Sequence, residues 1–526
     1  MKKFTLWTVL VGMVLTFSNL SLKAQLGVQD IKIGVVSDIH IFDSTLIIND
    51  GPALQQYLAY DRKLLKESHA IARSVIDSLK TLNLDILLVA GDLTKDGEYL
   101  SMQTLAAMFQ ELENVGTEVF VVPGNHDINN PHSVSYDGAS MTPIPGTSPA
   151  QFRTLFNNNG FGQAIVSDTA SLSYVAEPIA GLQILALDVC RYDSNYAIGS
   201  PETGGGFKPQ VLHWALDRIA EAKANGKVII GIEHHNLLEH YLGQKSMFSE
   251  YIIDDWDTIS TMLADAGLKV MFTGHYHAQD IISKTTTSGN QIFDVETGSL
   301  VTYPCPYRVM TLNTDTNLII DGKRVTVIDF NTNGLPFQTY ARNYIESGLP
   351  LLVNYILTSP PYSLDSITAS MVVPAVTETF IAHYEGNEGT PSAQTQGVIQ
   401  MLKVHPTHYA MGYALEGIWN DASPDDWTVT IDLAYQNTSI GYSSTLNTNS
   451  ILLFPNPSTG IFNLITPFEN QNIFIQVFDG QGKEVKRLNT DNQKNTIIDL
   501  SSLQAGAYMI VLSGNGIKLS KKIVIE

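Results

Sequence analysis

The sequence has few cysteines and few basic residues. Cys190 and Cys305 are its two cysteines, which allow at most one internal disulfide and exclude a thiolate metal cluster. Any metal ion must therefore be held by nitrogen and oxygen ligands. Lys and Arg number 31 against 52 Asp and Glu, a formal net charge of −21. A surface this acidic repels a phosphate backbone, so nucleic acid is an unlikely partner.

Long apolar runs, internal repeats and charge blocks are also missing. Beyond residue 24, no run of 18 or more apolar residues occurs, so no membrane span is expected. Apolar residues make up 44% of the chain and charged residues 16%, which excludes disorder, collagen and a coiled coil as the main architecture. The 526 residues correspond to roughly three domains at about 150 residues each. We therefore expect a globular chain with several folding units.

The first 24 residues have the layout of a secretory signal peptide. Lys2 and Lys3 precede an uncharged, mostly apolar run over residues 4–17, and a small residue, Ala24, follows a polar stretch. A membrane anchor is the alternative, but this run is shorter than the ~20 residues that a spanning helix needs. We predict that residues 1–24 are removed on export.

Residues 447–526 have the pattern of short strands separated by turn residues. Ile475 and Val477 alternate with Gln476 and Phe478, which predicts a small all-β sandwich. FPNPSTGIFNL at 454–464, VFDGQGKEV at 477–485 and LQAGAYMIVL at 503–512 follow one another in this order. This combination resembles the C-terminal sorting domain of type IX secretion substrates in Bacteroidetes. The resemblance implies the type IX secretion machinery as a partner and a secreted or cell-surface location reached through the periplasm. A generic sandwich or a carbohydrate-binding appendage is the alternative.

Residues 25–324 alternate short apolar runs with amphipathic stretches, which is an α/β pattern. The apolar runs end abruptly in polar residues, and ligand groups collect at the carboxyl ends of strands in such sheets. Carboxylate, imidazole and carboxamide side chains together predict a site for Mn, Fe or Zn. The candidates are Asp38, His40, Asp92, Asn125, His126, Asp127, His234, His235, His275 and His277.

The ordered set DxH, GD, GNHD, H and GHxH over residues 31–302 resembles the calcineurin-like metallophosphoesterase family. The resemblance implies a four-layer α/β fold, a β-sandwich flanked by helices, with two metal ions. In that pattern Asp92 bridges the ions. Asp38, His40 and His277 would hold one ion, and Asn125, His234 and His275 the other. A degenerate fold without metals is disfavoured because no ligand position is substituted.

Two positions in these motifs carry further expectations. His126 would contact the developing charge or protonate the leaving group, and Asp127 would orient its ring. The alternative is a structural His126 with Asp127 as a helix cap. Because adjacent side chains on a strand point to opposite faces, only one of His234 and His235 can reach the metals. His234 matches the family position, which leaves His235 at the pocket rim or in the core.

Residues 325–446 form an accessory region predicted to mix helix and strand, and they carry no recognisable chemical motif. This region would be a lid or a packing module. The polar run 191–206 after Asp188 is either a substrate wall or a surface loop. His69, His213 and His240 have no ligand partner at a useful spacing. Whether the two cysteines pair is left open.

The sequence therefore predicts an exported metal-dependent phosphoesterase that hydrolyses mono- or diesters of small phosphorylated molecules. A hydroxide activated by two metals would attack phosphorus. A surface-displayed binding or adhesion protein with a structural metal site is one alternative. An extracellular nuclease is another, and it would require a basic groove.

Overall fold

The computed structural model describes residues 29–420, 424–435, 452–465, 474–479, 483–489, 495–514 and 517–526. The predicted signal peptide, residues 1–24, lies outside these ranges. Among the described residues, no helix has both the length and the apolarity needed to cross a membrane.

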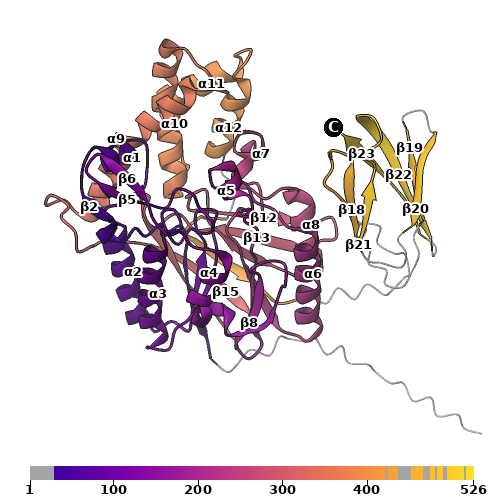
Figure 1. Cartoon of the computed structure of the whole chain (residues 1–526), viewed down its shortest axis with the longest axis horizontal. Helices are drawn as coiled ribbons and strands as arrows, with labels where there is room; N and C mark the ends of the chain where they lie inside the picture. The colour runs from indigo at the N-terminus through magenta and orange to yellow at the C-terminus, as the bar shows by residue number, and fades with distance from the viewer. Residues whose placement is uncertain are drawn as a thin grey trace, which may run out of the picture.

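Two mixed sheets, packed face to face, form the body of the molecule (Figure 1). The first has the order β16-β15-β14-β1-β3-β4, and the second has the order β12-β13-β11-β10-β9-β8-β7. The strands of the first sheet are β1 (Ile31–Val36), β3 (Ile86–Ala90), β4 (Glu118–Val122), β14 (Pro306–Leu312), β15 (Asn317–Arg324) and β16 (Thr428–Asp432). Those of the second are β7 (Ala164–Ser167), β8 (Tyr174–Ile179), β9 (Leu182–Ala186), β10 (Val228–Ile232), β11 (Val270–Thr273), β12 (Asp280–Thr285) and β13 (Gln291–Glu296).

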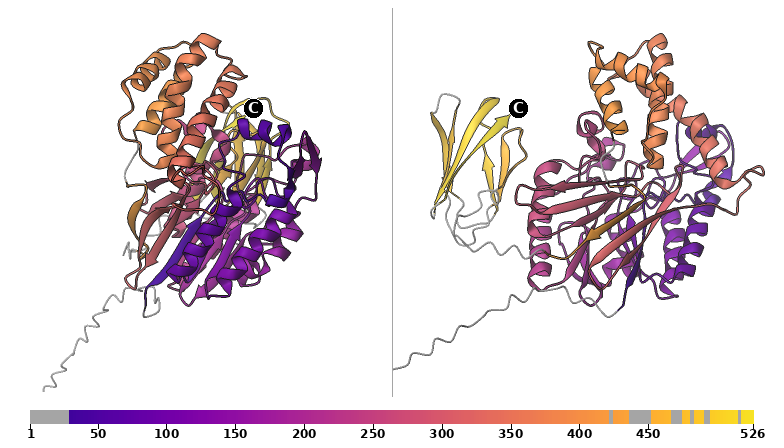
Figure 2. Two further views of the ribbon diagram at one scale, coloured as in Figure 1. Left: turned by 90° about the vertical axis from the view of Figure 1, so that its left-hand side faces the viewer. Right: turned by 180° about the vertical axis from the view of Figure 1, so that it is seen from behind.

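Helices cover the outer face of each sheet. Strand β3, with the sequence ILLVA, is buried at all five positions, as expected for a parallel strand covered on both faces. Helices α2 (Ser68–Leu82) and α3 (Tyr99–Glu113) pack on the first sheet, and α6 (Pro209–Ala224) and α8 (Trp256–Ala266) pack on the second. The layers are therefore helix, sheet, sheet and helix (Figure 2). The predicted four-layer α/β fold is confirmed.

The parallel strands direct their carboxyl ends to one edge of the sandwich. Strands β1, β3 and β4 are parallel neighbours in the first sheet, and β9, β10, β11 and β13 are parallel neighbours in the second. Each of the predicted ligand motifs follows one of these strands within about two to five residues. The topology thus brings segments from distant parts of the sequence to a common edge.

Four helices form a cap over that edge, shown in orange at the top of Figure 1. They are α9 (Phe337–Thr358), α10 (Ser366–Glu385), α11 (Ala393–Lys403) and α12 (Tyr409–Trp419). Residues 369–383 and 395–402 lie in helices α10 and α11, and the accessory region 325–446 also contains strand β16. Strand β16 then returns to the edge of the first sheet and pairs antiparallel with β15. The helical cap is therefore inserted between two strands of that sheet.

Smaller elements complete the body. A small sheet of β2 (Ile47–Asn49), β5 (Val134–Asp137) and β6 (Ser140–Pro143) stands beside α1 (Pro52–Ala59). The short helices are η1 (Ser44–Leu46), α4 (Pro149–Leu155), η2 (Asn157–Phe161), α5 (Asn195–Ile198), α7 (Gln244–Met247) and η3 (Ser249–Tyr251).

The C-terminal segment forms two antiparallel sheets with their own apolar core. The first contains β17 (Leu452–Phe454), β18 (Ile461–Ile465) and β21 (Asn495–Asp499). The second contains β19 (Phe474–Phe478), β20 (Glu484–Asn489), β22 (Gly506–Gly514) and β23 (Ile517–Ile525). Ile475 and Val477 are buried between the sheets, which agrees with the predicted alternation and with an all-β tail.

Candidate metal centre

Two groups of potential ligands meet at the carboxyl edge of the sandwich. One comprises Asp38, His40 and His277, and the other comprises Asp92, His234 and His275. Within each group the candidate ligand atoms lie within 4.8 Å of one another, and every residue is buried. The seventh predicted ligand, Asn125, places its Oδ1 atom 3.2 Å from His234 Nε2. The structure therefore brings all seven predicted ligand residues together.

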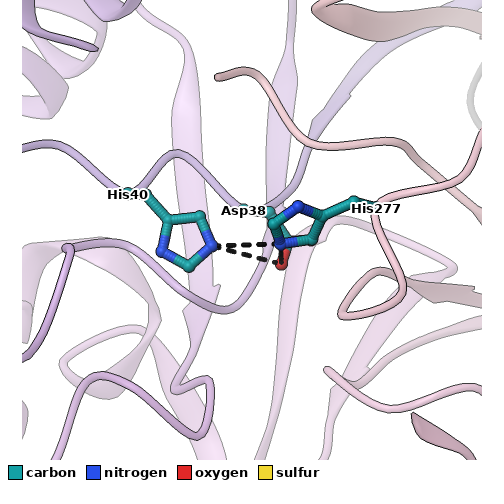
Figure 3. Close-up of side chains that lie close together, drawn as sticks. All are labelled: Asp38, His40 and His277. Carbon is teal, nitrogen blue, oxygen red and sulfur yellow. Dashed lines mark hydrogen bonds and ion pairs between the residues drawn. The ribbon is translucent and has the colours of Figure 1, made fainter. Parts of the chain in front are cut away.

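The first group has the geometry of a cation site (Figure 3). His40 Nδ1 faces the Thr94 carbonyl at 3.3 Å, and His277 Nδ1 faces Thr302 Oγ1 at 3.1 Å. These outer contacts leave the two Nε2 atoms facing each other at 3.2 Å. Asp38 Oδ1 lies 3.2 Å from His277 Nε2, and no hydrogen bond is made to this buried oxygen in the described part of the chain. Lone pairs that converge in this way fit a cation.

The second group is held in a similar way. His234 donates from Nδ1 to the Ala90 carbonyl at 2.8 Å, so Nε2 is the nitrogen that faces Asn125. His275 donates from Nε2 to the Glu250 carbonyl at 3.2 Å, which leaves its Nδ1 atom available to a metal. Each histidine thus has its outer nitrogen engaged by oxygen and its inner nitrogen free for an ion. This is the usual arrangement around protein metal sites.

Asp92 lies between the two groups. Its Oδ1 atom is 3.5 Å from His234 Nε2, and its Oδ2 atom is 3.5 Å from His40 Nε2. One carboxylate oxygen therefore faces each set of ligands. Two cations at about 4 Å repel each other, and a shared anion offsets that repulsion. The residues present fit two ions bridged by Asp92.

The backbone around the site is strained. Five of the seven predicted ligand residues have positive φ angles, a region that residues other than glycine rarely adopt. They are Asp38 (48°), His40 (41°), Asp92 (49°), His275 (74°) and His277 (71°). Two glycines make room for the ligands: a Cβ atom at Gly124 would lie 2.0 Å from Asp92 Oδ1, and one at Gly274 would lie 1.8 Å from Ser37 Oγ. The glycines in GNHD and GHYH are therefore needed for close packing.

Burial and neighbouring charges shift the pKa values of the site residues. Burial raises the pKa of Asp92, but the nearby His234 and His126 outweigh it and hold this pKa well below its usual value. Burial, followed by the charge of Arg62, lowers the pKa of His277 to about 4. Burial, followed by the neighbouring His235, also lowers the pKa of His275 well below 6.5. Asp92 is thus anionic, and His275 and His277 are neutral at neutral pH, as metal ligands must be. Burial lowers the pKa of His234, but the charge of Asp92 outweighs it and raises this pKa to about 9, so His234 would release a proton on binding an ion.

His126 lies beside the ligands without joining them. Its side chain is 25% exposed, whereas the ligand side chains are buried. Its Nδ1 atom is 2.9 Å from Asp96 Oδ1, and the other oxygen of Asp96 contacts the Lys95 ammonium. His126 is thus a half-buried imidazole, fixed by a buried carboxylate, at the open side of the site.

The expectation that Asp127 orients the His126 ring is wrong. The Asp127 carboxylate accepts hydrogen bonds from the backbone N–H groups of Leu93, Thr94 and Gly124 at 2.8–3.0 Å. These bonds tie the loop after β4 to the loop after β3. Since Asp127 follows His126 directly, its side chain points the other way, toward the backbone. The orienting carboxylate is Asp96.

Three residues near the site were not predicted from the sequence. Asp96 lies in GDLTKDG, four residues after Asp92, so the second aspartate of that stretch was the available signal. Arg62 and Lys63 lie between α1 and α2 in a stretch without a motif. The charge of Lys63 lowers the pKa of His40, after the larger effect of burial. Arg62 and Lys63 add positive charge beside a site that is otherwise acidic.

The other polar residues considered from the sequence contact parts of the protein outside the two ligand groups. His235 is buried and donates to the Thr203 carbonyl at 2.8 Å, which anchors the 191–206 loop. Asp188 accepts from the Tyr192 hydroxyl at 2.6 Å. His240 is buried between Asp280 and Asp294, at 3.3 and 3.2 Å. The two cysteines are both buried and both free, so they form no disulfide.

Comparisons with known proteins identify two regions. Residues 31–279 match the family model described as calcineurin-like phosphoesterase, and residues 452–526 match that of the secretion system C-terminal sorting domain. A probable cyclic nucleotide phosphodiesterase from Vesicomyosocius okutanii subsp. Calyptogena okutanii is 30% identical over 69 residues, which are 13% of this chain and 28% of that protein. The match thus spans less than a third of that relative's length.

Solved structures show similar proteins at low identity. A dimetal phosphatase from Danio rerio is 13% identical with a TM-score of 0.39, covering 56% of this chain and 96% of that one. The purple acid phosphatase from yellow lupin (Lupinus luteus) seeds is 13% identical with a TM-score of 0.36, covering 57% of this chain and 52% of that one. Residues 31–279 are thus similar to calcineurin-like phosphoesterases, and the type IX secretion sorting domain at residues 452–526 indicates export to a cell-surface or secreted location.

Proposed function

We propose that this chain is an exported phosphoesterase that hydrolyses phosphate mono- or diesters of small molecules with two bound metal ions. The observation that carries the proposal is the position of Asp92, whose two oxygens each face a separate set of imidazole nitrogens. A single structural ion has no need for this division. The family match of residues 31–279 supports the same reaction class.

The proposed ligands divide into two sets that share Asp92. Asp38, His40 and His277 hold one ion, and Asn125, His234 and His275 hold the other. When bound, the ions supply a nucleophile at neutral pH and offset the charge of the phosphoryl oxygens. Mn, Fe and Zn all suit this set of oxygen and nitrogen donors.

His126 would act on the leaving group. Its ring lies at the open side of the site, 5.2 Å from the His40 ring between centroids. Asp96 accepts from Nδ1, so Nε2 is the atom that would donate a proton to the leaving oxygen. Asp127 would contribute indirectly, by fixing the loop that carries Asn125 and His126.

The test compares hydrolysis of para-nitrophenyl phosphate with that of its bis ester. The chain is stripped with a chelator and reloaded separately with Mn, Fe, Zn or Mg. We expect turnover with at least one ion, and the preferred ester assigns the substrate class. If protein that retains two ions per chain shows no turnover with any ion, the proposed enzymatic function is refuted. A binding or adhesion protein is then favoured. Cleavage of DNA in preference to both esters would instead favour a nuclease.

A further inference from the structure

An apolar cavity lies between the helical cap and the metal centre. Its volume is about 110 Å³, and eighteen residues line it. Helices α9, α10 and α12 supply one side, with Val353, Val376 and Leu415 among the buried residues. The other side is the segment of α7 and η3. Arg62 is the one charged residue among the described residues that line it.

The cavity and the metal centre share a wall. Tyr251 lines the cavity, and its ring centroid lies 4.7 Å from that of the ligand residue His275. Tyr276, between the two histidines of GHYH, also lines the cavity and packs edge-on against Tyr251 at 4.9 Å. A ligand whose phosphorus sits at the metal centre is therefore about one aromatic ring away from the cavity.

Arg62 places a positive charge in the wall of the cavity. Its guanidinium carbon lies 5.6 Å from the centre of the Tyr384 ring in the cavity wall. Arg62 lines the cavity together with Tyr251, whose ring packs against that of His275. The buried Nε atom of Arg62 has no hydrogen-bond partner in the described part of the chain. A guanidinium with an unused donor at this border suits an anionic oxygen.

The lining determines the chemistry of the occupant. A void among apolar side chains loses dispersion contacts, and a group that fills it restores them. An engineered apolar cavity of about 150 Å³ takes up benzene, so 110 Å³ suits a short alkyl segment. Ile356 also lines the cavity and is 43% exposed, so a longer chain can leave toward solvent past it.

We propose that the substrate is a phosphate ester with an alkyl chain, the chain lying in this cavity while Arg62 faces the phosphate. This inference rests on the proposed function, and it narrows the substrate from small phosphate esters in general to amphiphilic ones. The cap then acts as a specificity element, because its helices form most of the cavity wall.

The experiment measures chain-length dependence in the metal-loaded full chain. The substrates run from methyl to octyl, as alkyl para-nitrophenyl phosphates if the bis ester is preferred and as alkyl phosphates if the monoester is. We expect kcat/KM to rise about fourfold per methylene, which corresponds to ~0.8 kcal/mol per buried CH₂, and to level off when the chain fills the cavity. A flat series would overturn the proposal while leaving the phosphoesterase intact.

Variants locate the effect. Val353→Phe fills the cavity, so the octyl-to-methyl ratio of kcat/KM should fall toward unity. Leu351→Phe makes a similar change on the exposed side of α9 and should keep the wild-type ratio. If Val353→Phe does not fold, Leu357→Ala enlarges the cavity and should move the plateau to longer chains. An unchanged series in the folded cavity variant would place the chain elsewhere and refute the proposal.

Binding separates the two proposals. Calorimetry with non-hydrolysable alkylphosphonates of the same chain lengths measures binding affinity without turnover. Affinity that rises with chain length in an inactive protein would support the cavity and refute the phosphoesterase. Affinity and turnover that are both independent of chain length would refute the cavity alone, provided that the methyl ester is hydrolysed.

Discussion

Replacing Asp92 with asparagine tests the centre of the proposed site. The amide keeps the shape of the side chain and one oxygen, but it removes the negative charge and turns the second oxygen into a donor group. Asp92 and Asp38 are the two carboxylates among the seven ligand residues, and Asp92 alone faces both sets. The substitution therefore removes half of the fixed negative charge and the shared ligand together.

The size of the effect follows from the geometry. Two divalent ions ~4 Å apart repel by about 17 kcal/mol at an effective dielectric constant of ~20. One carboxylate charge at ~4 Å attracts a divalent ion by about 8 kcal/mol on the same scale. Even half of that loss would weaken binding of the second ion by about a thousandfold. We therefore expect Asp92→Asn to retain at most one ion, and Asp92→Ala to retain none.

The assay is metal analysis by mass spectrometry after chelation, reloading with stoichiometric manganese and desalting. The wild-type chain should hold two ions. Asp96→Asn is the matched control, because it removes another buried carboxylate four residues away that contacts His126 instead of the ligands. This control should keep both ions and lose about 10- to 100-fold in kcat. Two tightly held ions in Asp92→Asn, or equal metal loss in the control, would refute the bridging role.

Three further predictions concern other parts of the chain. His126→Ala should keep both ions and lose about a hundredfold in kcat, and normal turnover would remove His126 from the mechanism. Burial raises the pKa of Glu98 from 4.5 to about 7. The stability that protonated Glu98 contributes is therefore full below pH ~4.5 and is lost as pH rises through ~7, and this loss in the free energy of unfolding is about 3 kcal/mol at most. Between pH 5 and 8, the melting temperature of metal-loaded Glu98→Gln should therefore fall less with rising pH than that of the wild-type chain. The same pH dependence in both proteins would contradict this. Deleting residues 447–526 should leave hydrolysis intact but retain the protein in the periplasm, whereas deleted protein in the medium would contradict the sorting role.

Much of the site could be predicted from the sequence, because the polar residues of the site directly follow the apolar runs that form the strands. A buried strand such as β3 is a short apolar run, and Asp92 interrupts this pattern directly after it. The carboxyl ends of parallel strands share one edge, so residues as distant as Asp38 and His277 could be expected to meet. Glycines before Asn125 and His275 were visible too, although the reason for them became clear only from the close contacts they permit.

What the sequence could not supply were contacts set by the packing of segments that carry no motif. The partner of His126 is an example, because the adjacent Asp127 was the simplest candidate, yet its carboxylate is directed to backbone donors and Asp96 takes its place. The local sequence gives the residue types in a loop. The direction of each side chain depends on how two loops are held against each other.

The sequence by itself determined the order of the two recognisable regions, the candidate ligand set and the antiparallel tail. These features depend on local alternation and on residue types at strand ends, which are properties of short segments. The tertiary structure alone decided that four helices cap the site, and that Arg62 and the cap helices line an apolar cavity beside it. Such features arise where surfaces distant in sequence meet, and their shape depends on the packing of all the side chains involved.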